Sequence, residues 1–341
     1  MKNYLLIVTA VFLLAGCGSD GVDEPSVDGG EWLINAAQVF DGGPGKDGIP
    51  SVDSPNFSSV ADVDFLVAND LVVGVVHNGV ARAYPHPILD WHEIVNDDIG
   101  DLSVAVTYCP LTGTAIGWDR NLGSTNTTFG VSGKLFNTNL IPFDRDTDSY
   151  WTQIGLECVT GNRIGEKVTT IPVLETTWQT WRTAYPDSEV LNTDTGFSRN
   201  YQSFPYGDYR TNDNNIIFPV TNLDSRIPAK ERVLATIDGT TAKAYSIELF
   251  EDNRVIEDNF GGQDIMVIGS RDDNYVVAYN NPGGDFTAVT DQLPIIAIDV
   301  DGNTLTLDGR VSTGESLTQV NSFMAYFFSL PSFYTTDIYE D

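Results

Sequence analysis

Short apolar runs separated by turn residues dominate the chain from Leu71 onward, and this pattern predicts a protein built mostly of β-strands. Between two of these runs, Asn78 and Gly79 predict a tight hairpin, because both residues accept the positive φ angles of a type I′ turn. We expect strands at residues 71–76, 80–84, 102–108, 113–118, 126–131, 139–143, 285–289, 295–299 and 304–308.

Two segments instead space their apolar residues at helical intervals. Residues 87–96 and 175–185 each predict a short helix, and Pro186 ends the second one. Residues 192–231 are polar and rich in asparagine, which predicts a long irregular connection, whereas the aromatic residues 321–334 predict a buried helix or strand. The expected fold class is mostly β, of the α+β type, with a few short helices.

The apolar pattern also repeats within the chain. Residues 72–120 align without a gap onto residues 233–281, at a constant offset of 161. The two segments share a small set of anchor positions: Ala81 and Ala242, Arg82 and Lys243, Ala83 and Ala244, Tyr84 and Tyr245, Asp97 and Asp258, Gly100 and Gly261, Val106 and Val267. The sequence therefore predicts an internally duplicated, β-rich body.

The two copies differ at two positions where chemistry is possible. The first copy has His92 and Cys109, and the second has Asn253 and Ser270. Purely buried positions would favour apolar replacements of similar size, so these polar replacements indicate positions that tolerate exposure, as in a cleft. We interpret the first copy as the half that carries the functional site.

Residues 1–16 have the features of a bacterial secretory signal peptide. A lysine lies near the start, residues 5–14 are apolar but too few to span a bilayer, and LAGC at 14–17 resembles a lipobox. In lipoproteins with such a motif, the signal is cleaved before the cysteine, whose thiol carries a diacylglyceryl group. The resemblance implies a lipid anchor on Cys17, since two or more acyl chains hold a protein stably at a membrane.

Composition divides the rest of the chain into a tether and a body. Residues 17–40 hold the lipidated cysteine and a stretch dominated by Gly, Ser, Asp, Pro and Glu, which predicts a flexible tether. Residues 41–341 then form the folded domain. Gly18 follows the cysteine where an aspartate would indicate the inner membrane. We therefore expect a protein of the bacterial cell envelope, anchored at the outer membrane.

The charge and the remaining cysteines narrow the range of partners. With 18 Lys and Arg against 48 Asp and Glu, the chain has a formal charge of −30, which argues against nucleic acid, because phosphates require clustered basic residues. Cys109 and Cys158 could form a disulfide in an oxidising compartment, although a chain of this length does not need one.

Several sequence runs resemble a known family. They are GGPGKDGIP (42–50), ARAYP (81–85), DWHEIVND (90–97), TYCPLTGTA (107–115), FGVSGKLFN (129–137), FDRDTDSYWTQ (143–153), TTWQTWRTAYPDSEVL (176–191), DTGFSRNY (194–201) and PYGDYR (205–210). These runs resemble DUF3179, a family of uncharacterised proteins, from about residue 40 to the C-terminus, and the resemblance implies no activity. Many members read Cys-Pro-Leu-Cys in the central motif. Here Thr112 replaces the second cysteine, which leaves at most one sulfur for chemistry at this site.

Candidate chemistry centres on the first copy. On the predicted helix, Asp90 and Glu93 share a face, and His86 precedes the helix within reach of Asp90. His92 and Cys109 lie on consecutive elements, where contact between them is plausible. A structural role is the alternative, since a lone cysteine at the end of an apolar strand is commonly a small buried hydrophobe.

Three functions stay open from the sequence. The first is a ligand- or metal-binding module in which Cys109, His92 and His86 hold a soft ion such as copper or zinc, with Asp90, Glu93 or Thr112 nearby. The second is a thiol-dependent enzyme with Cys109 as nucleophile and His92 as base. The third is a non-catalytic surface protein that binds a partner through residues 192–231.

Overall fold

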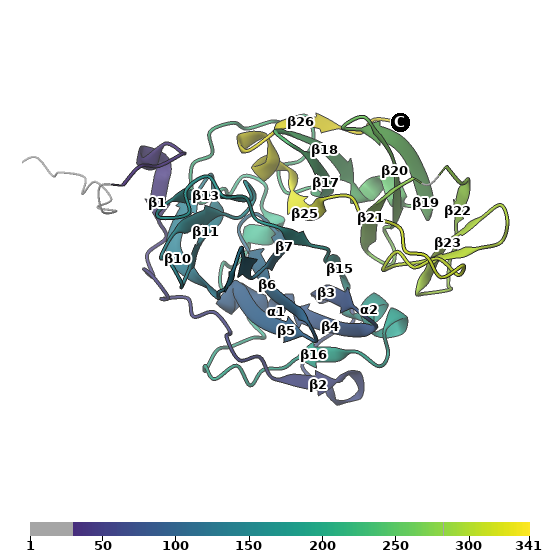
Figure 1. Cartoon of the computed structure of the whole chain (residues 1–341), viewed down its shortest axis with the longest axis horizontal. Coiled ribbons are helices and arrows are strands. Elements are labelled where there is room, and N and C mark those ends of the chain that lie inside the picture. Colours follow the sequence, from purple (N-terminus) through teal and green to yellow (C-terminus); the bar gives the residue numbers. More distant parts are fainter. Residues whose placement is uncertain (1–29, 282) are drawn as a thin grey trace, which may run out of the picture.

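The computed structural model describes residues 30–281 and 283–341 and confirms a β-rich fold with a few short helices (Figure 1). The predicted signal peptide and the predicted lipidation site at Cys17 lie outside these residues. Within them, no helix has the length and apolar character needed to cross a membrane.

Nine strands of the first half form two sheets that hold the region around the predicted site. They are β2 (Phe57–Ser59), β3 (Leu71–His77), β4 (Val80–Pro85), β5 (Ile94–Ile99), β6 (Leu102–Cys109), β7 (Thr114–Asp119), β14 (Thr170–Ile171), β15 (Leu174–Thr177) and β16 (Glu189–Leu191). One sheet has the order β15-β3-β4-β16-β2 and is antiparallel except between β4 and β16. The other has the order β14-β7-β6-β5 and is antiparallel throughout.

The predicted hairpin between β3 and β4 is confirmed. Asn78 and Gly79 have φ angles of 48° and 83°, as a type I′ turn requires. Pairing of His77 with Val80 closes the hairpin and fixes the register of both strands.

Both predicted helices are present but shorter than expected. Helix α1 (His86–His92) ends because Glu93 adopts a left-handed conformation, with φ of 57°, and its N–H donates to the Leu89 carbonyl. The β-branched residues that follow begin β5 instead of extending the helix. Helix α2 (Trp178–Ala184) starts late because residues 174–177 pair with β3.

A third sheet covers the predicted site from the other side. Its strands are β1 (Val39–Asp41), β10 (Phe129–Phe136), β11 (Asn139–Asp144), β12 (Tyr150–Thr152) and β13 (Glu157–Thr160), in the order β1-β10-β11-β12-β13. A small hairpin of β8 (Asn121–Leu122) and β9 (Thr125–Asn126) precedes it. The predicted strand at 126–131 is therefore misplaced: β10 extends to residue 136 because it pairs on both edges, with β1 and with β11.

The second half contains ten strands in three sheets. They are β17 (Arg232–Asp238), β18 (Thr241–Ser246), β19 (Arg254–Phe260), β20 (Gln263–Ser270), β21 (Tyr275–Asn280), β22 (Phe286–Ala288), β23 (Ile295–Asp299), β24 (Thr304–Thr306), β25 (Ser322–Tyr326) and β26 (Thr335–Ile338). The sheet orders are β25-β17-β18-β26, β19-β20-β21 and β22-β23-β24. Short 3₁₀ turns complete the described chain: η1 (Ala36–Gln38), η2 (Val60–Asp62), η3 (Tyr209–Thr211), η4 (Ile247–Phe250) and η5 (Phe327–Ser332).

The sheets β15-β3-β4-β16 and β25-β17-β18-β26 have the same strand order and pairing sense, with one parallel pair at the same position. In each, a basic residue and a tyrosine contact one aspartate. The contacts are Arg82 Nη1 to Asp97 at 2.8 Å and Tyr84 OH to Asp97 at 2.6 Å, then Lys243 Nζ to Asp258 at 2.5 Å and Tyr245 OH to Asp258 at 2.6 Å. These shared anchors therefore hold strands together in both segments.

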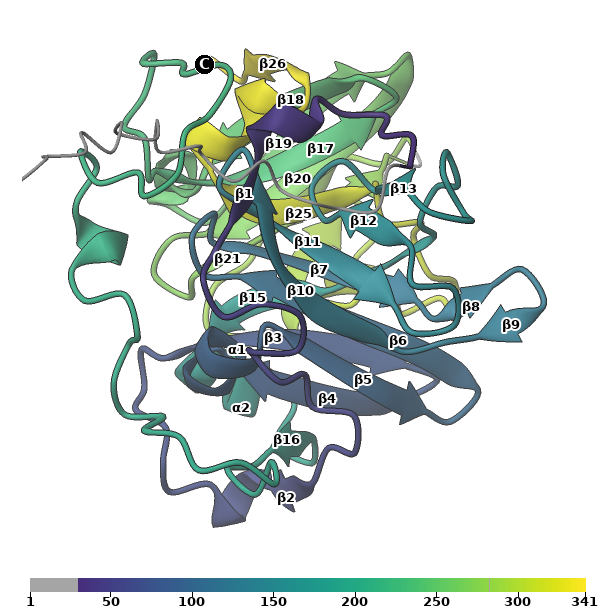
Figure 2. The ribbon, with the colours of Figure 1, turned by 90° about the vertical axis from the view of Figure 1, so that its left-hand side faces the viewer.

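The two halves pack around a common core. One cluster of buried side chains includes Trp118 and Trp151 from the first half and Val233 and Phe323 from the second. Strand β25 pairs with β17 and lies against β7, so the C-terminal aromatic segment fills the space between the halves (Figure 1). Figure 2 also shows β25 in the same part of the molecule as β7.

Candidate functional site

A small cavity lies in the first half, between β10, β11, the end of β6 and two irregular segments. Its volume is about 60 Å³, enough for a few water molecules or one compact organic molecule. Most of the lining is apolar, and four polar side chains interrupt it: Glu93, Cys109, Lys134 and Tyr206. The loop 42–49 and the segment 206–218 close it from outside. The segment 192–231, predicted as a partner-binding surface, thus contributes to the cavity wall.

Glu93 is a fully enclosed carboxyl group at the junction between α1 and β5. The backbone N–H of Tyr108 donates to the Glu93 carbonyl at 2.6 Å, which fixes the left-handed residue against β6. Burial and, next to it, the charge of Asp90 raise the pKa of its side chain, and a hydrogen bond from the Tyr206 hydroxyl lowers it; the resulting pKa is about 8. At neutral pH the carboxyl group therefore keeps its proton and can donate a hydrogen bond into the cavity.

Cys109 lines the same cavity as a neutral thiol. Burial is the main cause that raises its pKa, and the proximity of Glu93 adds to the effect. Its Sγ lies 3.7 Å from the Thr138 carbonyl oxygen and also hydrogen-bonds Thr112. A nucleophilic cysteine needs the opposite environment, with a lowered pKa and an exposed sulfur, so this arrangement does not activate Cys109.

Native thiols are expected to react slowly. In the full chain carrying Cys17→Ser, the two remaining cysteines are both buried and unbridged, and a disulfide-exchange reagent should label them about a hundredfold more slowly than in urea, an opening cost of about 3 kcal/mol. Absorbance of the released thiolate measures the rate. Rapid labelling of one thiol in the native protein would show that Cys109 or Cys158 is exposed and reactive.

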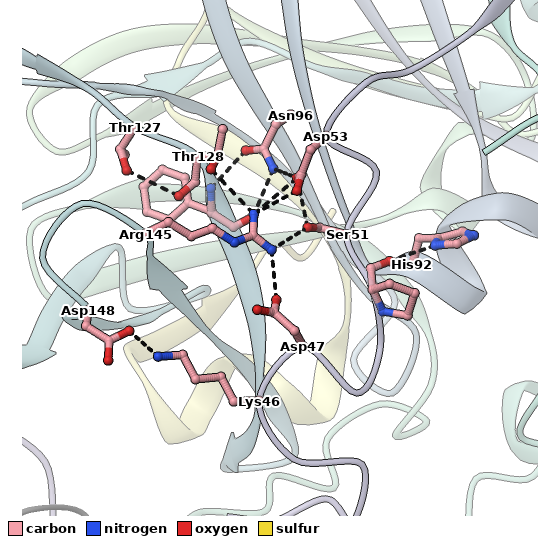
Figure 3. A network of polar contacts seen from close by, with 12 residues as sticks. Lys46, Asp47, Ser51, Asp53, His92, Asn96, Thr127, Thr128, Arg145 and Asp148 are labelled. Atoms are coloured by element: carbon pink, nitrogen blue, oxygen red, sulfur yellow. Dashed lines mark hydrogen bonds and ion pairs between the residues drawn. The ribbon is translucent and has the colours of Figure 1, made fainter. Parts of the chain in front are cut away.

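His92 is engaged away from Cys109. Its Nδ1 lies 2.7 Å from the Pro50 carbonyl oxygen (Figure 3). Its Nε2 lies 2.7 Å from the Tyr201 hydroxyl. Burial lowers its pKa. Since both ring nitrogens already have partners, the predicted pairing of His92 with Cys109 is not formed. His92 instead holds the loop before β2 against the irregular segment around Tyr201.

A network of polar contacts fixes the same loop over the cavity (Figure 3). The Arg145 guanidinium bonds Asp47 at 2.8 Å, Asp53 at 3.0 Å and Ser51 at 3.0 Å. Asn96 of β5 donates to Asp53 at 2.6 Å. These contacts attach the Gly-rich loop to two sheets. They therefore fix the position of the loop residues that form one wall of the cavity.

The predicted metal-ligand set is not assembled either. In residues 30–281 and 283–341, no three His, Cys, Asp or Glu side chains come together in a way that could hold a metal ion. Cys109 lies in the cavity, His92 faces Pro50 and Tyr201, and His86 Nε2 lies 3.3 Å from Glu175 Oε2. Thr112 accepts a hydrogen bond from Asn139 at 3.0 Å. These side chains therefore have separate partners in the described residues, and a shared metal site stays a prediction from the sequence.

A second buried cluster lies next to the cavity and joins the halves. Asp90 lies close to His86, which is the first residue of α1, and it also pairs with Arg210. Burial raises the pKa of Asp90 to about 6, although Arg210 and His86 lower it. Across from His86, Glu175 Oε1 contacts Arg232 Nη2 at 2.5 Å.

Sequence reasoning missed four residues of these two sites: Lys134, Glu175, Tyr206 and Arg232. Each comes from a segment far from residues 86–112 in the chain. No local motif marks them. Lys134 and Tyr206 lie within the family-like runs 129–137 and 205–210, whereas Glu175 and Arg232 lie outside all of these runs.

Comparison with known proteins identifies the family without adding a function. Searches of curated proteins and of solved structures each found no match. The family described as "Protein of unknown function (DUF3179)" matches residues 46–337, nearly the whole chain. The chain therefore belongs to the DUF3179 family.

Proposed function

We propose that this protein is a cell-envelope lipoprotein that binds a small molecule in the cavity of its first half. The observation that carries the proposal is the combination of a protonated Glu93 carboxyl and a neutral Cys109 thiol within a mostly apolar cavity. Enclosed, mostly apolar cavities with a few polar groups are the usual form of small-molecule sites. The LAGC motif at 14–17 supports membrane attachment through Cys17.

The lining favours a compact ligand that is largely apolar and carries an acceptor oxygen. Ile49, Leu111 and Leu140 offer apolar contact, and burying the alkyl part of a ligand there removes it from water. The protonated carboxyl group of Glu93 supplies a hydrogen-bond donor. A ligand without an acceptor would leave that donor partly unsatisfied, which costs binding free energy.

We also infer that residues 233–281 are a copy of this half that lacks the site. This inference is supported by the shared strand order of the sheets β15-β3-β4-β16 and β25-β17-β18-β26, and by the residues at the equivalent positions. Arg254 stands where Glu93 does and pairs with Asp341 at 2.8 Å. Ser270 stands where Cys109 does and hydrogen-bonds Asp273 at 3.2 Å.

Binding of butyramide, a neutral four-carbon amide with an acceptor oxygen, tests the proposal. Saturation-transfer NMR on the full chain should show transfer to butyramide, with a dissociation constant in the millimolar range, about −4 kcal/mol, as befits so few atoms. Ile49→Trp replaces a half-buried aliphatic side chain in the cavity lining by a bulky indole ring, which takes up space in the cavity. We expect this variant to lose the transfer.

Val300→Trp serves as the matched control, because Val300 is 76% exposed and lies outside the cavity. It should bind butyramide as the wild type does, and circular dichroism should show both variants folded. The absence of transfer in the wild type, or equal transfer in wild type and Ile49→Trp, would contradict a ligand site in this cavity.

A further inference from the structure

Lys134 is an unpaired cation in a strongly acidic protein. It lies on β10, is half-buried, and contributes to the lining of the cavity. In the described part of the chain its ammonium group has no hydrogen-bond or ion-pair partner. Every other lysine or arginine described there has at least one such contact.

This exception is notable because carboxylates are abundant. The chain has 48 Asp and Glu against 18 Lys and Arg, so an ammonium group on the surface readily finds a partner. An unpaired ammonium group beside an apolar cavity is available to a ligand, and it bonds a negatively charged oxygen more strongly than a neutral one.

The backbone next to Lys134 departs from regular strand geometry. The register of β10 against β11 shifts between Val131 and Lys134, and Gly133 within the shift has a φ of 76°. A side chain added at Gly133 would collide with the backbone of Gly45 in the covering loop. Irregularities of this kind commonly re-aim a side chain next to a functional site.

Asp41 is the acidic residue opposite Lys134 in the sheet, and it does not neutralise it. The two residues are register partners between β1 and β10. The Asp41 carboxylate accepts a hydrogen bond from the Gly43 N–H at 2.7 Å, within its own turn, and no ion pair to Lys134 is formed. The lysine therefore retains its capacity for an external anion.

We propose that the ligand of this cavity is a small monocarboxylate, whose carboxylate contacts Lys134 at the mouth while its alkyl part lies against Ile49 and Leu140. This inference rests on the proposed ligand-binding function and names the ligand class. A single cation suits a single negative charge. Phosphates and dicarboxylates carry a second charge that Lys134 alone does not offset, and the surrounding field of a protein with net charge −30 repels them.

The group inside the cavity is compatible with such a ligand. Glu93 keeps its proton below about pH 8, so it does not repel a carboxylate under neutral conditions. The apolar wall then removes the alkyl part of a short monocarboxylate from water. The small volume, about 60 Å³, favours short chains over long ones.

Butyrate and butyramide form a matched pair of probes, since they have nearly the same shape and differ in charge. Titration of the full chain at pH 6.5, followed by NMR, should give butyrate about tenfold tighter binding than butyramide, as expected for one charge-assisted hydrogen bond. Lys134→Met should remove this preference, so that butyrate and butyramide bind with similar dissociation constants. Lys134→Gln is the second variant, with the same expected loss, should the methionine variant fold poorly.

Lys167→Met is the charge control, because Lys167 is 67% exposed and pairs with Glu157 away from the cavity. It should keep the tenfold preference. Butyramide binding without any preference for butyrate would overturn the carboxylate inference and leave the ligand site intact. Failure of both probes to bind would instead overturn the proposed function itself, and a preference that survives in both Lys134 variants would show that another group holds the anion.

Discussion

Replacing Glu175 by glutamine is expected to lower the free energy of unfolding by about 3–5 kcal/mol, the usual cost of breaking a buried ion pair on one side. The Glu175 side chain is only 2% exposed and lies between His86 at 3.3 Å and Arg232 at 2.5 Å. Glutamine keeps the shape but removes the charge, which leaves the partly buried guanidinium of Arg232 without its counter-charge. Because Glu175 belongs to β15 and Arg232 to β17, the loss falls on the contact between the two halves.

Urea unfolding at pH 7 measures this effect, and the pH dependence supplies a second readout. Burial alone would raise the pKa of Glu175, but the charges of His86 and Arg232 bring it down to about 2, from an ordinary 4.5. A lowered pKa means that the folded state releases the proton more readily, so this stabilisation is present above pH 4.5 and is lost as the pH falls towards 2. The variant should lack that part of the acid sensitivity.

Glu248→Gln is the matched control for this experiment. Glu248 pairs with Arg271 at 3.1 Å, but its side chain is 60% exposed, and exposed pairs contribute at most about 1 kcal/mol. A loss of less than 1 kcal/mol in Glu175→Gln, similar to the control, would show that the buried cluster does not hold the halves together. A double-mutant cycle with Arg232→Leu then separates the pair energy from the cost of the orphaned charge.

Replacing Glu93 by glutamine is expected to have the opposite effect and to stabilise the protein near neutral pH. The pKa of Glu93 is raised from 4.5 to about 8 by burial and by Asp90. The folded state must hold a proton that the unfolded state has released, so stability is full below pH 4.5 and falls as the pH rises through 8. At pH 7, which is 2.5 units above 4.5, each unit costs 1.36 kcal/mol, or roughly 3 kcal/mol in all.

Glutamine has no proton to lose, so the free energy of unfolding of the variant at pH 7 should be higher by roughly 3 kcal/mol, seen as unfolding at a higher urea concentration. The difference in free energy between variant and wild type should shrink towards pH 5. Glu257→Gln is the control: Glu257 is exposed on β19, and surface changes of this kind stay within about 0.5 kcal/mol. An equal stability of Glu93→Gln and wild type across pH 5–8 would show that Glu93 is not a buried protonated carboxyl group. A stabilising replacement at this position is typical of a residue kept for function at a cost in stability.

Local patterns predicted most of the fold. Strands β3, β4, β6 and β11 fall within a residue or two of their predicted bounds, because a short apolar run bounded by turn residues is a property of consecutive residues. The same reasoning overextended α1, because the spacing of Ile94 and Val95 suits a helix as well as a strand. Pairing of β5 with β6 decided between the two.

Candidate residues were predicted less well than the elements that carry them. Glu93 and Cys109 do line a common cavity, and Asp90 does lie near His86. The contact between His92 and Cys109 does not form, because the histidine bonds Pro50 and Tyr201. Proximity in the chain indicated which elements lie near one another. The direction of each side chain, however, depends on the residues packed around it.

By itself, the sequence determined the β-rich class, the hairpin at Asn78-Gly79, the membership of the DUF3179 family and the half in which to search for a site. The tertiary structure decided that loop 42–49, β10 and the segment 206–218 enclose Glu93 and Cys109, and that Lys134 stays unpaired beside them. The physical reason is that the spacing of apolar residues and the preferences of turn residues act between near neighbours in the chain. Burial, pKa and ion pairing depend instead on which distant segments exclude water from a group, and only the folded chain brings those segments together.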